Sequence, residues 1–223
     1  LTYEVFSHEL AVRTNHLDAT HGSFNGVALF LYPPDVLDQP VDLQITPPEG
    51  WQVFCGLERT AERSWRAPNF DTLFDSPVEM GPVEPLTFQV EGIEHRIVIW
   101  GEGDWDADRL TEDTARIVRA HAEMFGGLPY EHYTFIVHLT DEGRGGLEHH
   151  NSTILLFPRD GFRDGPPGTE LDAQGRPDDR YLEWLRLVSH EFFHVWNVKR
   201  IRPARLGPFD YQRENYTRDL WTV

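Results

Sequence analysis

Short apolar runs separated by prolines characterise residues 1–93. In VDLQI the apolar residues Val41, Leu43 and Ile45 alternate with polar ones, which is the period of a half-buried strand. Similar runs are VFSHELAVRT, GVALFLY, WQVFCGL and PLTFQVEG. Prolines lie between the runs, where they do not interrupt the hydrogen bonds of a central strand. The pattern predicts an antiparallel, β-sandwich-like N-terminal domain over residues 1–93.

From residue 94 the pattern changes to alternating strands and helices. Strands are predicted at 95–100, 133–140 and 152–157, and helices at 106–127 and 180–198. Gly126 and Gly127 are well placed to end the first helix. One face of that helix is predicted to carry its apolar side chains, namely Leu110, Ile117, Val118, His121, Met124 and Phe125. The Gly/Pro/Asp-rich segment 158–179 reads as a surface loop, and the whole order of elements predicts an α+β fold.

The second helix contains the segment HEFFH. His190 and His194 are four residues apart, so in a helix both imidazoles project from one face and can reach the same ion. Catalytic zinc keeps three protein ligands and one water molecule. Glu191 then stands beside the metal as a general base that later acts as a general acid. The sequence therefore predicts one catalytic Zn²⁺ held in part by His190 and His194.

Charge and cysteine content exclude several other classes of protein. Lys and Arg number 20 against 37 Asp and Glu, giving a formal net charge of −17, which argues against nucleic acid or an anionic membrane as partner. Cys55 is the only cysteine, which rules out an intrachain disulfide and predicts a buried thiol. The first residues lack the pattern of a signal peptide. These features lean toward the cytoplasm without fixing the compartment.

Three separated segments together resemble one known family. They are FDSPVEMGP at 74–82, GGLEHHNST at 145–153 and HEFFHVWNVKRIRP at 190–203, and they are similar to the glycyl aminopeptidase family of bacterial zinc metallopeptidases. The resemblance implies a thermolysin-like catalytic fold of the aminopeptidase N group, usually followed by a PDZ domain. On this basis residues 94–223 correspond to the N-terminal portion of the catalytic domain.

The resemblance also locates the third zinc ligand. In the related enzymes this ligand is a Glu directly after an LW-type segment, and here DLWTV ends at Val223. The expected ligand is therefore the next residue, and the oxyanion stabiliser would follow it. Glu214 is the only Glu after His194 and is the alternative within the chain. With two histidines alone, we expect weak zinc binding and an inactive fragment.

A second candidate site is GGLEH. Gly145 and Gly146 allow close approach of the backbone to a ligand, and the strand that follows could offer its edge to a peptide. By resemblance, Glu148 binds the free α-amine of the substrate and limits cleavage to the first residue, with Gly and Ala preferred. From the residues alone, a glycine turn followed by a solvated Glu148 is the alternative. His149 and His150 are weaker candidates, one for the cleft and one for the surface.

Two other functions remain open at this point. One is a peptide-binding module whose peptidase-like half is inactive, and the other is a zinc endopeptidase in which Glu148 does not close the cleft. The basic run NVKRIRPAR is interpreted as a solvated helix end rather than as a site for the substrate carboxylate built from Lys199, Arg200 or Arg202. The expected partner is a peptide with a free N-terminus.

Overall fold

The structure is a computed structural model that describes residues 1–162, 179–207, 209–214, 216 and 218. The predicted loop at 158–179 lies for the most part outside these described residues. Among the described residues no helix is both long and apolar enough to cross a bilayer.

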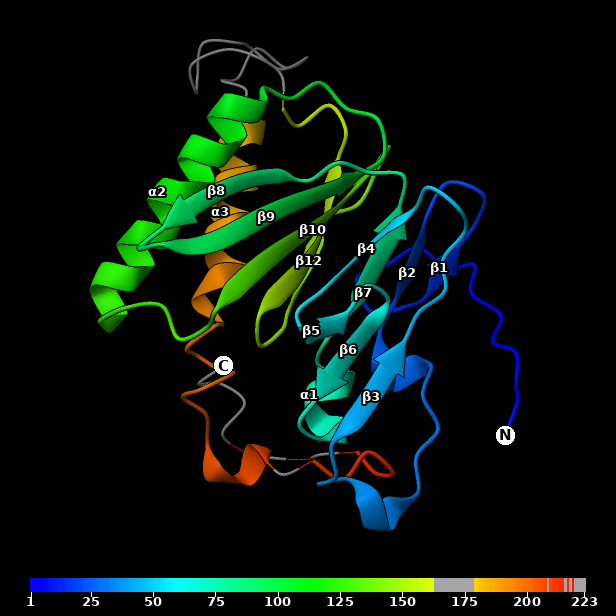
Figure 1. The fold of residues 1–223 in the computed structure, drawn as a ribbon. Coiled ribbons are helices and arrows are strands. Elements are labelled where there is room, and N and C mark those ends of the chain that lie inside the picture. Colours follow the sequence, from blue (N-terminus) through cyan, green and yellow to red (C-terminus); the bar gives the residue numbers. More distant parts are fainter. Residues whose placement is uncertain (163–178, 208, 215, 217, 219–223) are drawn as a thin grey trace.

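Two small antiparallel sheets form the N-terminal part (Figure 1). The first has the strand order β1-β2-β7-β4 and comprises His16–Leu17, Gly22–Phe24, Val78–Gly81 and Gln52–Cys55. The second has the order β3-β6-β5 and comprises Val41–Gln44, Ser64–Ala67 and Glu58–Ala61. The short helix α1 (Phe70–Phe74) follows β6, and single 3₁₀ turns lie at Gly26–Ala28 and Pro34–Val36.

A shared core joins these two sheets. Side chains from both sheets and from α1 form one buried apolar cluster, namely Leu43, Ile45, Cys55, Leu57, Trp65, Ala67, Leu73 and Val78. Burial of this apolar surface is the main force that holds one sheet against the other. The Cys55 thiol is 4 % exposed, as its sequence context predicted, and burial raises its pKa to about 11. The predicted β-sandwich-like arrangement is confirmed.

A five-stranded mixed sheet forms the second part. Its order is β11-β12-β10-β9-β8, with bounds Gly145–Glu148, Ser152–Pro158, His132–Thr140, Ile93–Trp100 and Leu86–Val90. Strands β9, β10 and β12 are parallel, whereas β8 and β11 are antiparallel to their neighbours. The run at 86–90 was grouped with the N-terminal strands in the sequence analysis. In the structure it is β8, which pairs with β9 in this sheet. The predicted boundary at residue 93 stays a prediction.

Helices α2 (Ala107–Phe125) and α3 (Arg180–Phe193) pack against each other and against this sheet (Figure 1). The Asp106 side chain accepts a hydrogen bond from the Arg109 amide at the start of α2, and Gly126, at φ 81°, ends the helix as predicted. The apolar face of α2 differs from the predicted one at Met124, which is 69 % exposed. The α+β order of elements is confirmed.

A buried polar cluster lies where the N-terminal part meets the five-stranded sheet. Glu79 of β7 accepts hydrogen bonds from His21 at 2.8 Å and from His138 of β10 at 2.9 Å, and all three side chains are at most 1 % exposed. The His16 ring bonds the other nitrogen of His21 at 2.8 Å, and Trp100 stacks on His21. Hydrogen bonds of this kind offset the cost of burying a carboxylate. The cluster therefore fixes the two parts relative to each other.

Candidate active site

Helix α3 presents the HEFFH segment, but it ends earlier than its sequence pattern predicted. The apolar pattern indicated a helix to residue 198, whereas α3 ends at Phe193 and His194 is its C-cap. After this point the amide of Val195 bonds the Phe192 carbonyl, and the amide of Lys199 bonds the His194 carbonyl at 3.1 Å, so the regular spacing is lost. His194 keeps helical backbone angles. The four-residue offset between His190 and His194 is therefore preserved.

The two imidazoles are arranged as a metal would require. The Nε2 atoms of His190 and His194 lie 3.2 Å apart, and the Nδ1–H of His194 donates to the Asn197 carbonyl. That bond leaves the Nε2 lone pair of neutral His194 directed at His190, the outer-shell arrangement usual for ligating histidines. Zn–N bonds of about 2.0–2.1 Å in a tetrahedron separate two nitrogens by roughly 3.3 Å. The residues present therefore fit zinc.

The Glu191 carboxyl group is buried beside His190. Its side chain is 6 % exposed, and its Oε1 lies 4.0 Å from His190 Nε2. Burial, together with the negative charge of Glu148, raises the pKa of Glu191 to about 7, while the charges of His194 and Arg13 act in the opposite direction. A carboxyl with such a pKa exchanges its proton near neutral pH, as a general base requires.

The GGLE segment lies directly opposite Glu191. Residues Gly145–Glu148 form β11, an outer strand of the five-stranded sheet, and α3 packs against it. A Cβ atom built on Gly146 would come within 2.2 Å of the Glu191 Cδ, whereas one built on Gly145 would meet nothing within 4 Å. Gly146 thus approaches the Glu191 side chain closely, and the predicted approach of both glycines to a ligand stays a prediction. The sequence analysis expected the strand after the glycines to offer its edge to a peptide. In the described part of the chain, that strand (β12) is paired on both sides, and β11 is the edge strand.

Three of the predicted site residues converge. Glu148, Glu191 and His194 each offer a ligand atom, and these atoms lie within 4.8 Å of one another. His190 joins them through its contact with His194. Glu214 is exposed and accepts a hydrogen bond from Tyr216, and it does not belong to a metal-capable group in the described residues. Its role as a zinc ligand stays a prediction.

The basic run after α3 contributes to structure. Arg200 donates to the carbonyls of His150, Val195 and Pro129, and Lys199 pairs with Asp75 at 2.8 Å. The prediction of a solvated helix end did not include these contacts. Asp75 belongs to the FDSPVEMGP segment, which the sequence marked only by resemblance.

Two family models match segments of this chain. Residues 1–82 match the family described as Peptidase M61 N-terminal domain, and residues 183–223 match M61 glycyl aminopeptidase. Together the two matches cover more than half of the chain. The chain belongs to the M61 peptidase family.

Solved structures extend this comparison. An aminopeptidase N family protein from Idiomarina loihiensis is 34 % identical, with a TM-score of 0.88, and the match covers 97 % of this M61 chain and 37 % of that one. An M1 zinc metallopeptidase from Deinococcus radiodurans is 18 % identical over 62 % of this chain and 36 % of that one, with a TM-score of 0.43. No curated protein matches. This M61 chain thus spans little more than a third of the length of these structures.

Proposed function

We propose that this M61 chain forms the first part of a zinc aminopeptidase that removes small N-terminal residues, such as Gly or Ala, from peptides. The observation that carries the proposal is the convergence of Glu148, on an outer strand, with Glu191 and His194. An outer strand can pair with an extended peptide, which then runs beside these side chains.

Each residue has a defined task in this proposal. His190 and His194 would hold zinc, and a bound zinc ion supplies polarisation of a water molecule and of the scissile carbonyl. Glu191 accepts the proton of the attacking water and delivers it to the leaving amine. Glu148 binds the free α-amine of the substrate through a charge-assisted hydrogen bond, so the first peptide bond lies at the reacting centre.

The substrate test uses the protein expressed from its complete gene. Glycyl, acetyl-glycyl and leucyl substrates are compared, with rapid cleavage expected only for the glycyl substrate. Equal cleavage of the acetylated substrate would identify an endopeptidase, and peptide binding without turnover would identify a binding module. Glu191→Gln should abolish turnover and retain zinc, and Glu148→Gln should raise KM for the free amine.

The zinc test uses the 223-residue chain itself. Zinc stoichiometry and affinity are measured for the parent, for Glu214→Gln and for His194→Gln. We expect weak binding in the parent that is unchanged in Glu214→Gln and lost in His194→Gln. Tight binding that disappears in Glu214→Gln would show instead that Glu214 is the third ligand.

A further inference from the structure

The Asp75 side chain lies where the N-terminal part touches the candidate active site. Asp75 is the C-cap of α1, whose first turn is closed by the Asn69 side chain accepting from the Thr72 amide at 2.8 Å. The Asp75 backbone amide bonds the Asp71 carbonyl at 3.0 Å. These bonds fix the direction of the side chain, which points from the N-terminal part toward His149. The side chain is 25 % exposed.

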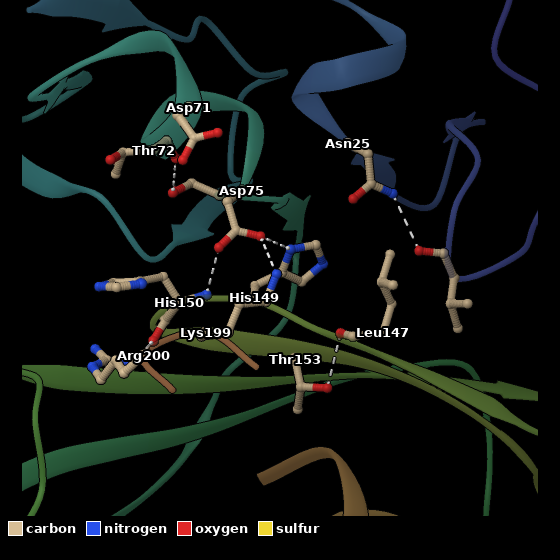
Figure 2. A network of polar contacts seen from close by, with 12 residues as sticks. Asn25, Asp71, Thr72, Asp75, Leu147, His149, His150, Thr153, Lys199 and Arg200 are labelled. Atoms are coloured by element: carbon tan, nitrogen blue, oxygen red, sulfur yellow. Dashed lines mark hydrogen bonds and ion pairs between the residues drawn. The ribbon is translucent and has the colours of Figure 1, made fainter. Parts of the chain in front are cut away.

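The two carboxylate oxygens of Asp75 accept hydrogen bonds from the segment after β11 and from the segment after α3. Oδ1 accepts from His149 Nδ1 at 3.1 Å and from Lys199 Nζ at 2.8 Å, and Oδ2 accepts from the His150 amide at 2.9 Å. Figure 2 shows these donors converging on Asp75 from the turn between β11 and β12 and from the segment after α3. Burial opposes ionisation, but His149 and Lys199 lower the pKa of Asp75 below its ordinary value, so the carboxylate is charged at neutral pH.

The partners of Asp75 lead directly to the proposed catalytic groups. His149 follows Glu148 in the chain, is 4 % exposed, and its amide bonds the Ser152 carbonyl at 2.9 Å. The Lys199 amide bonds the His194 carbonyl at 3.1 Å. One carboxylate therefore connects the residue beside Glu148 to the residue that bonds His194.

We propose that Asp75 is a positioning residue that holds Glu148 at a fixed place relative to His194 and Glu191. The inference rests on the proposed aminopeptidase function. It means that a residue of the N-terminal part positions the side chain that binds the substrate amine. Because charge-assisted bonds are short and directional, one half-buried carboxylate can set the spacing of two segments that are far apart in the sequence.

The test compares Asp75→Asn with Asp71→Asn in the protein expressed from its complete gene. Asp75→Asn keeps the shape but loses the charge and one acceptor, so Glu148 is held less precisely. We expect KM for a glycyl substrate to rise roughly tenfold with zinc content unchanged, which corresponds to the loss of about one hydrogen bond to a charged group. The change should fall on KM more than on kcat, because the amine is bound in both the ground and the transition state. Asp71→Asn, on the same helix, should leave both constants unchanged.

Two further measurements test the positioning role of Asp75 independently of the Asp75→Asn kinetics. Lys199→Gln shortens and neutralises the donor to the same oxygen and should shift KM in the same direction, which tests the inference if Asp75→Asn fails to fold. In the 223-residue chain, hydrogen exchange at the His150 amide should accelerate in Asp75→Asn and not in Asp71→Asn.

The inference and the proposed function can fail separately. A folded, zinc-loaded Asp75→Asn protein with the parent's KM overturns the positioning role. An effect of Asp71→Asn equal to that of Asp75→Asn also overturns it. If the parent shows no turnover of glycyl substrates, or if Glu148→Gln leaves KM unchanged, the proposed function itself is wrong. In that case the hydrogen-exchange result still reports whether Asp75 holds the segment after Glu148.

Discussion

Gly146 and Glu191 lie so close together that no side chain fits between them. A Cβ atom on Gly146 would stand 2.2 Å from the Glu191 Cδ and 2.3 Å from its Oε1, because α3 packs directly against β11. The glycine thus allows the buried carboxyl to reach Glu148 and His194. Its neighbour Gly145 faces open space.

This difference predicts opposite outcomes for two conservative substitutions. Gly146→Ala should push Glu191 away and lower turnover by about 100-fold, the effect of misplacing a reacting group by roughly 1 Å. Gly145→Ala should leave turnover close to that of the parent. Steady-state kinetics on a glycyl substrate, in the protein expressed from its complete gene, compares the two variants, and equal activity in both would contradict the packing.

A second prediction concerns the dependence of stability on pH. His95 is fully buried, its Nδ1–H donates to the Ile93 carbonyl, and its Nε2 accepts from the Tyr130 hydroxyl at 2.8 Å. Burial lowers the pKa of His95 from 6.5 to about 4. Between these values the unfolded chain binds the proton and the folded chain does not, so stability falls as the pH drops from about 6.5 toward 4.

The difference corresponds to about 3 kcal/mol of unfolding free energy when fully developed. His95→Gln removes the titrating imidazole. The difference in unfolding free energy between this variant and the parent should therefore become smaller as the pH falls from 7 to 4.5. Urea unfolding at both pH values measures this. The exposed His8→Gln variant serves as control and should follow the parent, and a constant gap for His95→Gln would exclude the effect.

The third prediction concerns the cluster around Glu79. Glu79→Gln places an amide N–H₂ against one of two imidazoles that now donate to the carboxylate, at 2.8 and 2.9 Å. A histidine must then change tautomer, and for His138 this would put a proton on Nδ1, which is buried without a partner among the described residues. We expect a loss of roughly 3 kcal/mol in unfolding free energy, as for a broken buried pair. The exposed Glu84→Gln variant should show no loss in the same urea titration.

The fourth prediction concerns Arg200. Its guanidinium donates to the carbonyls of Pro129, His150 and Val195, and burial lowers its pKa while leaving it charged. Arg200→Lys offers a single ammonium group, which cannot reach these diverging acceptors from one position. Thermal unfolding should show a loss of about 1–3 kcal/mol. Exposed Arg213→Lys, whose only recorded contact in the described residues is with Asp210, should unfold like the parent.

Much of the site was predictable because its information is local. The four-residue spacing of His190 and His194 follows from helical geometry, and it survives even though α3 ends at Phe193. Gly126 ends α2 because few other residues adopt its positive φ. Among the residues predicted for the apolar face of α2, Met124 is exposed.

What the sequence by itself determined is therefore the order of elements, the four-residue spacing of His190 and His194, and the place of Glu148 in a glycine-rich segment. Only the tertiary structure decided that β8 joins β9, that β11 is the outer strand, and that Gly146 rather than Gly145 meets Glu191. It also decided the partners of Asp75 and Glu79, which are separated from His149 and His138 by 74 and 59 residues. Helical period and turn chemistry act over a few residues, whereas these contacts depend on how the sheets and α3 pack, which no local pattern encodes.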